Sequence, residues 1–261
     1  MPKKPNNRKA PPFPKDSDGN PTHFAAPPDE LPPVGVVYVA SGAAFQREAA
    51  ISARSVAKYD PALPITIRTS HPDELAGSTL PDSVTIEPIE RVRGLWSKPL
   101  YIPPLPYRRT LFLDTDTLVV HKDAFLPFMI LPARYAFALA HSPARGYSYL
   151  RGVPNCVPVF NSGVVFINGQ HPATFPVLRA WRRAYQRRRN TPRVSDQAIL
   201  SRILWDKKAP VYTLPPEWNC RGWRSGVAGV GQLRIVHNRQ AIKDQRLGRF
   251  KRRFATSGGH Y

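Results

Sequence analysis

The stretch that decides the fold is Arg109-Thr110-Leu111-Phe112-Leu113-Asp114-Thr115-Asp116-Thr117-Leu118-Val119-Val120. Apolar residues lie on both sides of a short acidic interruption, and a continuous apolar run is typical of a strand buried on both faces. The two carboxylates would then lie at the carboxyl edge of a parallel sheet, where open α/β folds bind ligands. Asp-x-Asp at such an edge suits a divalent cation, because hard cations take carboxylate oxygens and leave other positions for phosphates. The alternative is a solvated β-turn with Asp at both ends.

Strand and helix patterns alternate on the N-terminal side of this stretch. Val34–Ala40 has the composition of a buried strand, and apolar residues recur at helical spacing over residues 45–56, before Pro61 ends that helix. Residues 64–69 and 84–86 are predicted as the second and third strands. This alternation predicts right-handed crossovers and an α/β fold, with a mostly parallel central sheet flanked by helices.

The segments next to the acidic pair carry further signals. A short, proline-limited helix that packs under the sheet is expected at residues 95–102, and another strand at residues 135–140. Within the apolar run 159–167, the sequence Asn-Ser-Gly indicates a tight turn or a bulge with exposed backbone.

A helix is predicted beyond Pro176, to residue 188, with Leu178, Trp181 and Tyr185 facing inward. Its opposite face is strongly cationic, and it is either solvated or a docking surface for an anionic acceptor. The arginines of this face are Arg179, Arg182, Arg183, Arg187, Arg188 and Arg189.

The C-terminal elements are shorter. Ser195 is expected to cap a helix at residues 196–204 by accepting bonds from its first free N–H groups. Two short strands are expected at residues 211–214 and 233–237, and no internal repeat is apparent.

Composition fits a globular protein: 261 residues with 42% hydrophobic residues are enough for one large domain or two small ones. Cys156 and Cys220 are too few for a disulfide framework and lack metal-site spacing, so we expect reduced core thiols, with a single bridge as the alternative. No signal peptide and no membrane-spanning run is apparent, which favours a cytoplasmic protein with, at most, peripheral membrane contact.

The formal net charge is +20, and such an excess attracts polyanions: nucleic acid, anionic lipid or an acidic polysaccharide. Residues 1–33 are predicted to be a proline-rich, basic, disordered arm, either passive or functional, and residues 246–261 a basic tail. The intervening residues 34–245 form the predicted folded domain. A non-enzymatic nucleic-acid-binding protein is one hypothesis that this charge supports.

Five segments in order carry a family resemblance. They are residues 114–116, 160–164, 196–197, 214–219 and 235–237. Together they resemble the GT-A glycosyltransferases of family 8, the group containing glycogenin and bacterial lipopolysaccharide glucosyl- and galactosyltransferases. The resemblance runs from about Val36 to Lys243 and implies a GT-A fold, which is a Rossmann-like nucleotide-diphospho-sugar transferase fold.

The resemblance implies a metal held by Asp114, Asp116 and His237. A mixed carboxylate and imidazole set favours Mn²⁺, with Mg²⁺ as the substitute. Without the acidic pair, His237 would read as a strand-end histidine satisfied by hydrogen bonds.

The resemblance also places a UDP-sugar donor across the first strand and the following helix. Val39 and Ala40 would offer backbone to the base, and Phe45 lies where the family has a stacking tyrosine, although it also fits a core position. The residues implied for contacts to the donor's phosphates are Lys98, Arg239 and Lys243.

Contacts to the donor sugar are implied for two segments. Asn161, Ser162 and Gly163 match the turn that lies against the sugar, and Asp196 and Gln197 match the pair on its other side. Asp196 also suits a helix N-terminus without any ligand, because an acidic residue there interacts favourably with the helix dipole.

Two departures from the family pattern affect these expectations. Arg193 stands where some members have an acidic residue, which bears on sugar recognition. Residues 237–245 lack the family's Gly, Pro and Trp, which bears on how the phosphate loop closes.

The implied activity is transfer of a hexose from a UDP-sugar to an acceptor, with retention of anomeric configuration, and the acceptor is expected to be an anionic glycan or lipid-linked. The working hypothesis is attack on the leaving-group face. Asp196 or Gln197 would alternatively stabilise the sugar cation or act as nucleophile. A sugar-phosphate nucleotidyltransferase shares the architecture, but residues 41–44 do not supply its Gly-rich phosphate loop with a basic residue.

Overall fold

The computed structural model describes residues 28–76, 78–90, 98–142, 150, 152–187, 195–221 and 232–244. Most of the predicted basic arm, residue 245 and the whole predicted tail 246–261 lie outside these described residues, as do Arg188, Arg189 and Arg193. None of the described helices is both long enough and apolar enough to cross a bilayer.

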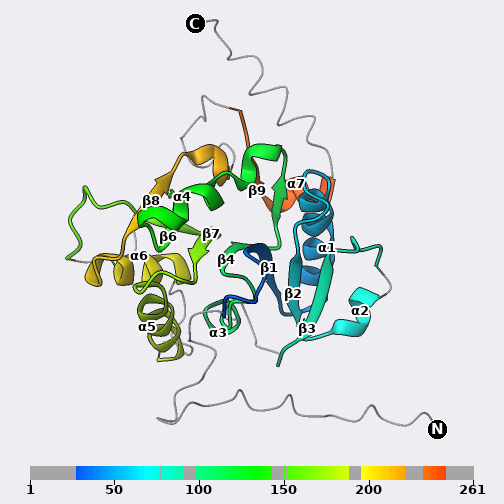
Figure 1. The fold of residues 1–261 in the computed structure, drawn as a ribbon, viewed down its shortest axis with the longest axis horizontal. Coiled ribbons are helices and arrows are strands. Elements are labelled where there is room, and N and C mark those ends of the chain that lie inside the picture. The colour runs from blue at the N-terminus through cyan, green and yellow to red at the C-terminus, as the bar shows by residue number, and fades with distance from the viewer. Residues whose placement is uncertain are drawn as a thin grey trace, which may run out of the picture.

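The described residues form a seven-stranded sheet in the order β3-β2-β1-β4-β7-β6-β8 (Figure 1). Its strands are β1 Val34–Ala40, β2 Ile65–Thr69, β3 Val84–Pro88, β4 Arg109–Leu113, β6 Phe137–His141, β7 Phe160–Asn168 and β8 Val211–Leu214. Strand β7 runs antiparallel to both of its neighbours, while the other pairs are parallel. The prediction of a mostly parallel central sheet is therefore confirmed.

Helices cover both faces of this sheet. They are α1 Ala43–Ala57, α2 Pro72–Ala76, α3 Lys98–Tyr101, α4 Pro127–Arg134, α5 Thr174–Gln186 and α6 Asp196–Asp206. A further helix, α7 Arg239–Asp244, packs against α1. Leu111 and Leu113 of β4 belong to the core cluster under α1, α2 and α4, whereas Phe112 belongs to the cluster under α3, α5 and α6. This alternation follows from the two-residue period of a strand, and it explains why the whole β4 run is apolar.

A second, two-stranded sheet positions the end of the chain against the acidic stretch. β5 Thr117–Val119 pairs antiparallel with β9 Ile235–His237, and Thr117 lies opposite His237. Between them in sequence lie the 3-10 helices η2 Lys122–Phe125 and η4 Pro216–Trp218. This pairing brings the predicted metal ligands together from distant parts of the sequence.

The arginine-bearing helix α5 differs from its prediction at its start. Leu178, Trp181 and Tyr185 are buried as expected, and the described arginines of the opposite face are partly or fully exposed. The helix begins at Thr174, so Pro176 lies inside it. Proline is tolerated there because the N–H groups of a first helical turn have no partner within the helix.

The predicted turn at Asn161-Ser162-Gly163 is wrong, because these residues lie inside the continuous, buried strand β7. The bulge, the other structure predicted there, is confirmed, since the β6–β7 register shifts across this segment: Leu139 pairs with Val165 but His141 pairs with Phe160. The predicted exposure is wrong, because Asn161 and Ser162 are only 3% and 2% exposed and Gly163 is buried as well.

Three further expectations need correction. Ser195 occupies the N-cap position of α6, but its side chain makes no capping hydrogen bond and faces the cavity described below. Cys220 is buried as expected, whereas Cys156 is exposed, and the two cysteines form no disulfide bridge. The strand expected at residues 135–140 begins at Phe137, after the preceding helix ends at Arg134.

Candidate functional site

The acidic pair lies in a tight turn where β4 passes into β5. The N–H of Asp114 donates to the Gly163 carbonyl of β7 at 2.7 Å, and the N–H of Thr117 donates back to the Asp114 carbonyl at 3.2 Å. The side chains of Asp114 and Asp116 are only 17% and 19% exposed. The chain therefore does turn here, but the turn is not the solvated one that the sequence left open.

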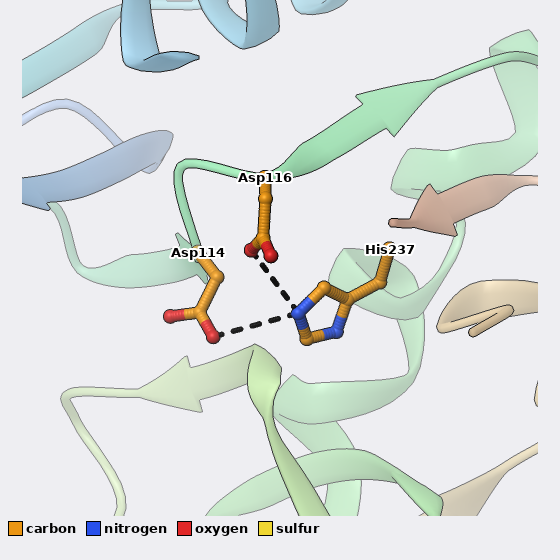
Figure 2. A group of neighbouring side chains, drawn as sticks. All are labelled: Asp114, Asp116 and His237. Atoms are coloured by element: carbon orange, nitrogen blue, oxygen red, sulfur yellow. Dashed lines mark ion pairs between the residues drawn. The ribbon is translucent and has the colours of Figure 1, made fainter. Parts of the chain in front are cut away.

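The His237 ring completes a three-residue cluster with these carboxylates (Figure 2). Its Nε2 lies 3.2 Å from Asp116 Oδ1 and 3.6 Å from Asp114 Oδ2. One ligand atom from each residue lies within 4.8 Å of the other two. The predicted ligands thus converge on one point.

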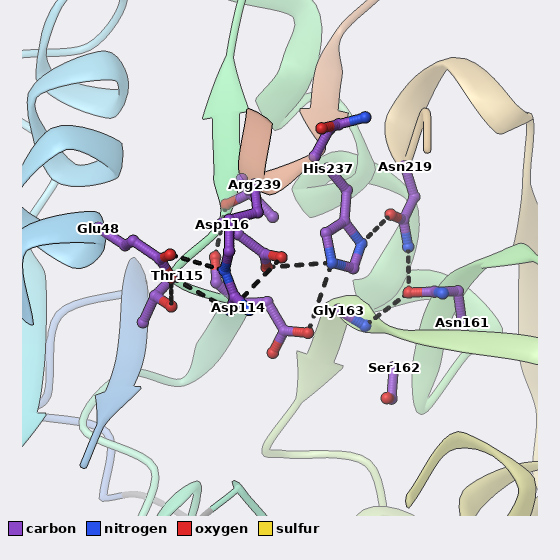
Figure 3. Close-up of polar contacts among 12 residues, drawn as sticks. Glu48, Asp114, Thr115, Asp116, Asn161, Ser162, Gly163, Asn219, His237 and Arg239 are labelled. Atoms are coloured by element: carbon purple, nitrogen blue, oxygen red, sulfur yellow. Dashed lines mark hydrogen bonds and ion pairs between the residues drawn. The ribbon is translucent and has the colours of Figure 1, made fainter. Parts of the chain in front are cut away.

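Two asparagines support the histidine from behind (Figure 3). Asn219 Oδ1 lies 2.8 Å from His237 Nδ1, and Asn219 Nδ2 donates to Asn161 Oδ1 at 2.9 Å. Asn161 Nδ2 donates onward to Gln197 Oε1 at 3.1 Å. A buried polar chain therefore links the cluster to the N-terminus of α6.

Lys98 lies between two carboxylates from different elements. Its Nζ is 2.8 Å from Asp114 Oδ2 and 3.1 Å from Asp196 Oδ2. Ser162 Oγ also donates to Asp196 Oδ2 at 2.7 Å. Burial lowers the pKa of Lys98, but the two acids outweigh it and raise the pKa above its ordinary value. Lys98 therefore remains charged throughout the physiological range.

The pKa values of the two acids of the turn are shifted in opposite directions. Burial raises the pKa of Asp114, and the nearby Lys98 and His237 only partly offset this effect. Burial also raises the pKa of Asp116, but the hydrogen bond and charge of His237, with Arg239 and Lys98, outweigh it and lower the pKa to about 2. Asp116 is thus the carboxylate that remains ionised over the widest pH range.

Helix α1 presents Phe45 and Glu48 towards the same turn. The guanidinium of Arg239 lies 5.4 Å from the centre of the Phe45 ring, and its Nε donates to Glu48 Oε1 at 2.7 Å. Thr115 Oγ1 donates to Glu48 Oε2 at 2.9 Å. Glu48 therefore binds both Thr115, the middle residue of the acidic turn, and the side chain of Arg239 next to that turn.

These groups surround one cavity of about 350 Å³. Its lining includes most of the sequence-predicted site residues: Val39, Phe45, Lys98, Asp114, Asp116, Asn161, Ser162, Asp196, Gln197, His237 and Arg239. Ala40 is buried at the end of β1, Gly163 packs against His237 beneath the lining, and Lys243 belongs to α7 with a side chain outside the described part of the structure.

Sequence reasoning missed several members of this site. Ser41, Thr115, Ser195 and Arg221 also line the cavity. Glu48 lies three residues after Phe45, a spacing that places both on one helix face and could have indicated it. Asn219 lay within the resemblance segment 214–219, but nothing in the linear sequence ties it to His237.

The arrangement suits binding of a cation together with an anionic ligand. The cluster offers two carboxylate oxygens and one imidazole nitrogen, while the positively charged Lys98, Arg221 and Arg239 line the same cavity. The site lies at the carboxyl ends of parallel strands β1 and β4, where open α/β sheets bind ligands.

Solved glycosyltransferase structures have this architecture. Mouse xyloside xylosyltransferase 1 aligns with a TM-score of 0.53 and 15% identity, covering 78% of this chain and 97% of its own. The chain has the GT-A glycosyltransferase fold. The galactosyltransferase LgtC, solved with donor and acceptor sugar analogues, aligns with a TM-score of 0.53 and 14% identity, covering 87% of this chain and 97% of LgtC.

A third similar structure is the glycosyltransferase GlyE of Streptococcus pneumoniae, with a TM-score of 0.52 and 16% identity over 78% of this chain. The alignment spans only 54% of GlyE. No protein-family model matches the chain, and no curated protein matches it either. At these identities the likeness establishes the fold, and the GT-A expectation from sequence is confirmed at that level.

Proposed function

We propose that this protein is a metal-dependent glycosyltransferase that moves a hexose from a UDP-sugar to an acceptor, with retention of configuration. The observation that carries the proposal is the cluster of Asp114, Asp116 and His237, whose ligand atoms lie within 4.8 Å of one another. This cluster forms part of a cavity at the ligand-binding edge of a GT-A sheet. Positively charged side chains that suit a diphosphate also line the cavity.

The donor set fits a divalent cation. Two carboxylate oxygens and one imidazole nitrogen favour Mn²⁺, and Mg²⁺ is the substitute. The second ring nitrogen of His237 is held by Asn219, as is usual for a metal-bound histidine. When bound, the cation would act as a Lewis acid that neutralises the charge of the diphosphate leaving group.

Cationic side chains of the cavity would stabilise the same leaving group. Lys98 stays protonated and reaches the cluster from α3, and Arg239 reaches it from α7. Fixed charges of this kind stabilise a transition state because they need no reorganisation during the reaction. Lys243 is proposed as a further diphosphate contact, in keeping with the family resemblance.

The remaining cavity walls are assigned to the base and the sugar. Phe45 and the backbone of Val39 would hold the base, with the ring of Phe45 as the stacking surface. Ala40, which is buried and does not line the cavity, is proposed as a base contact from the family resemblance alone. The proposed sugar contacts that line the cavity are Asn161, Ser162, Asp196 and Gln197. Gly163, which lies beneath the lining, is proposed as a contact from the family resemblance alone.

The surroundings of Asp196 support attack on the leaving-group face. Burial raises the pKa of Asp196, but Lys98 and the Ser162 hydrogen bond outweigh it and lower the pKa, so that the carboxylate stays ionised. One of its oxygens, Oδ2, is already engaged by Lys98 and Ser162. This engagement suits stabilisation of a sugar cation better than nucleophilic attack on the anomeric carbon.

The net charge of +20 favours a second candidate, a nucleic-acid-binding protein. The acidic pair in the cavity argues against phosphate binding at that point without a metal. Comparing the binding of UDP-sugar in Mn²⁺ with the binding of oligonucleotides across a salt series separates these functions. The proposed acceptor is an anionic glycan or lipid-linked molecule, which the partly or fully exposed arginines of α5 suit.

The decisive experiment is hydrolysis of UDP-glucose, UDP-galactose and their N-acetyl forms with Mn²⁺, with and without chelator. We expect release of UDP from at least one donor that requires the metal. Product analysis by NMR should then show the donor's anomeric configuration. Absence of metal-dependent turnover and of UDP binding would sink the proposed function, and an inverted product would sink its stereochemistry alone.

A further inference from the structure

The protonation pattern of the polar chain behind His237 is set by one backbone group. The N–H of Gly163 lies 2.8 Å from an Asn161 side-chain atom, and a backbone N–H can only donate. That atom of Asn161 must therefore be the oxygen, Oδ1. The assignment agrees with the other end of the amide, where Asn161 Nδ2 donates to Gln197 Oε1 at 3.1 Å.

The orientation of Asn219 follows from that of Asn161. Asn161 Oδ1 lies 2.9 Å from Asn219, so the facing atom of Asn219 must be its donor, Nδ2. The Asn219 oxygen then points to His237 Nδ1 at 2.8 Å. An amide oxygen only accepts, so Nδ1 must carry hydrogen.

If hydrogen were on Nε2 alone, two acceptor atoms would face each other at one contact, whichever way the Asn219 amide is turned. Hydrogen on Nε2 alone would place the Nδ1 lone pair against the Asn219 oxygen. Rotating the Asn219 amide would repair that contact, but it would set two acceptor oxygens against each other at Asn161. Asn161, Asn219 and His237 are 3%, 5% and 6% exposed, so water has little access to relieve the conflict.

We propose that Asn161 and Asn219 are positioning residues that hold hydrogen on Nδ1 of His237, so that Nε2 is the ring nitrogen left to bind a divalent cation beside Asp114 and Asp116. The inference rests on the proposed metal site and explains how the histidine becomes a ligand. Nε2 lies 3.2 and 3.6 Å from the two carboxylate oxygens, so a cation that displaces any proton on Nε2 would find one nitrogen and two oxygen ligands there. The backbone N–H of Gly163 sets the direction of every bond in the relay.

The relay also joins the two sides of the cavity. Asn161 bonds to Asn219, which holds His237, and to Gln197 at the start of α6. The side chain proposed to contact the sugar and the imidazole proposed to bind the metal are therefore oriented by the same amide. This arrangement gives Asn161 a role beyond contact with a donor sugar.

The test uses the full chain without metal or donor. Nitrogen-15 shifts of the His237 ring, assigned by comparison with His237→Gln, report which nitrogen carries the hydrogen when the ring is neutral. The parent should show the Nδ1–H form. Asn219→Leu, which removes the acceptor, should show a mixture or the Nε2–H form. Its affinity for Mn²⁺, titrated by calorimetry without UDP-sugar, should fall about 10- to 100-fold.

A matched pair at Asn161 separates hydrogen-bond direction from packing. Asn161→Asp keeps an acceptor for both Gly163 and Asn219, so the Nδ1–H form and Mn²⁺ affinity should be retained. Asn161→Leu removes that acceptor and should behave like Asn219→Leu. Ser201→Ala, which removes a different buried bond to β7 at the Phe160 N–H, should change neither readout.

The outcomes distinguish this inference from the proposed function. An Nε2–H form in the metal-free parent, or an unchanged tautomer in both Asn219→Leu and Asn161→Leu, would overturn the relay whatever the enzyme's activity. A parent that has the Nδ1–H form but binds no Mn²⁺ would instead refute the metal site, and with it the purpose assigned to the relay. Thermal unfolding of each variant identifies any that fail to fold. If a leucine variant fails, the tautomer and the Mn²⁺ affinity are compared between Asn161→Asp and the parent.

Discussion

Gly163 lies directly against the imidazole of His237, so that no side chain fits at this position of β7. A β-carbon on Gly163 would overlap His237 Cε1 and lie 2.6 Å from Nδ1 and 2.9 Å from Asp114 Oδ2. The strand backbone thus approaches two proposed metal ligands more closely than any other residue type would allow.

Gly163→Ala should therefore displace His237 and weaken Mn²⁺ binding by about 100-fold, at the upper end of the effects seen when the support of a ligand is lost. Gly35→Ala is the matched control, because its β-carbon would lie 2.6 Å from the Tyr107 ring, away from the cluster. It should lower the melting temperature but leave Mn²⁺ affinity unchanged. Equal Mn²⁺ affinities in the two variants would contradict the proposed placement of the ligand.

Asp116→Ala should abolish metal-dependent UDP release while the protein remains folded. The carboxylate supplies a proposed ligand, and its low pKa means that it is ionised at any working pH. Asp206→Ala on α6 serves as the control, since Asp206 is exposed and pairs only with Arg202 among the described ion pairs. Turnover by Asp116→Ala at the rate of Asp206→Ala would count heavily against the metal site.

Lys98→Met should lower turnover by roughly 100-fold, because a charge aimed at the leaving group is lost. It should also destabilise the fold by about 3 kcal/mol, since two largely buried carboxylates would lose their common partner. Lys207→Met, at the exposed end of α6, is the control in urea unfolding and in turnover assays. A Lys98→Met variant that retains both parental stability and parental turnover would remove Lys98 from the proposed mechanism.

Stability should fall above pH 10 partly because of Tyr38, a fully buried residue whose hydroxyl bonds to Ser52 at 2.9 Å. Burial raises the pKa of Tyr38 well above its ordinary value of 10.0. A raised pKa means that the contribution is complete below pH 10 and is lost as pH rises towards the folded-state pKa, because only the unfolded chain then releases the proton.

Tyr38→Phe should therefore show a shallower fall, by up to about 1.4 kcal/mol per pH unit, in urea unfolding between pH 10 and 11.5. At neutral pH the variant should be less stable by about 1 kcal/mol, because the Ser52 bond is lost. That bond supports the acidic turn, as Ser52 Oγ also contacts Thr117 Oγ1 at 3.1 Å. Parallel slopes for parent and variant above pH 10 would refute the assignment to Tyr38.

Local patterns predicted those elements whose side chains repeat regularly. The apolar run around Phe112 gave β4, and helical spacing gave α1 and the inward face of α5. For the Asn161–Gly163 segment the sequence predicts a bulge or an exposed turn, because a small polar sequence usually marks one, and only the bulge is found. Here the polar side chains lie inside a strand, since Asn219 and Gln197 satisfy Asn161 from other elements. Their partners lie 58 and 36 residues away along the chain, so no local pattern could indicate them.

The sequence by itself determined a buried strand that ends in two acids, because burial on both faces requires an uninterrupted apolar run and the carboxylates mark where that run stops. The resemblance added which distant residues to expect beside them. Only the tertiary structure decided that His237 lies opposite Thr117, that Glu48 holds Arg239, and that the N–H of Gly163 directs the bonds reaching His237. The physical reason is that hydrogen bonds act over a few ångströms in space and impose no period on the linear sequence.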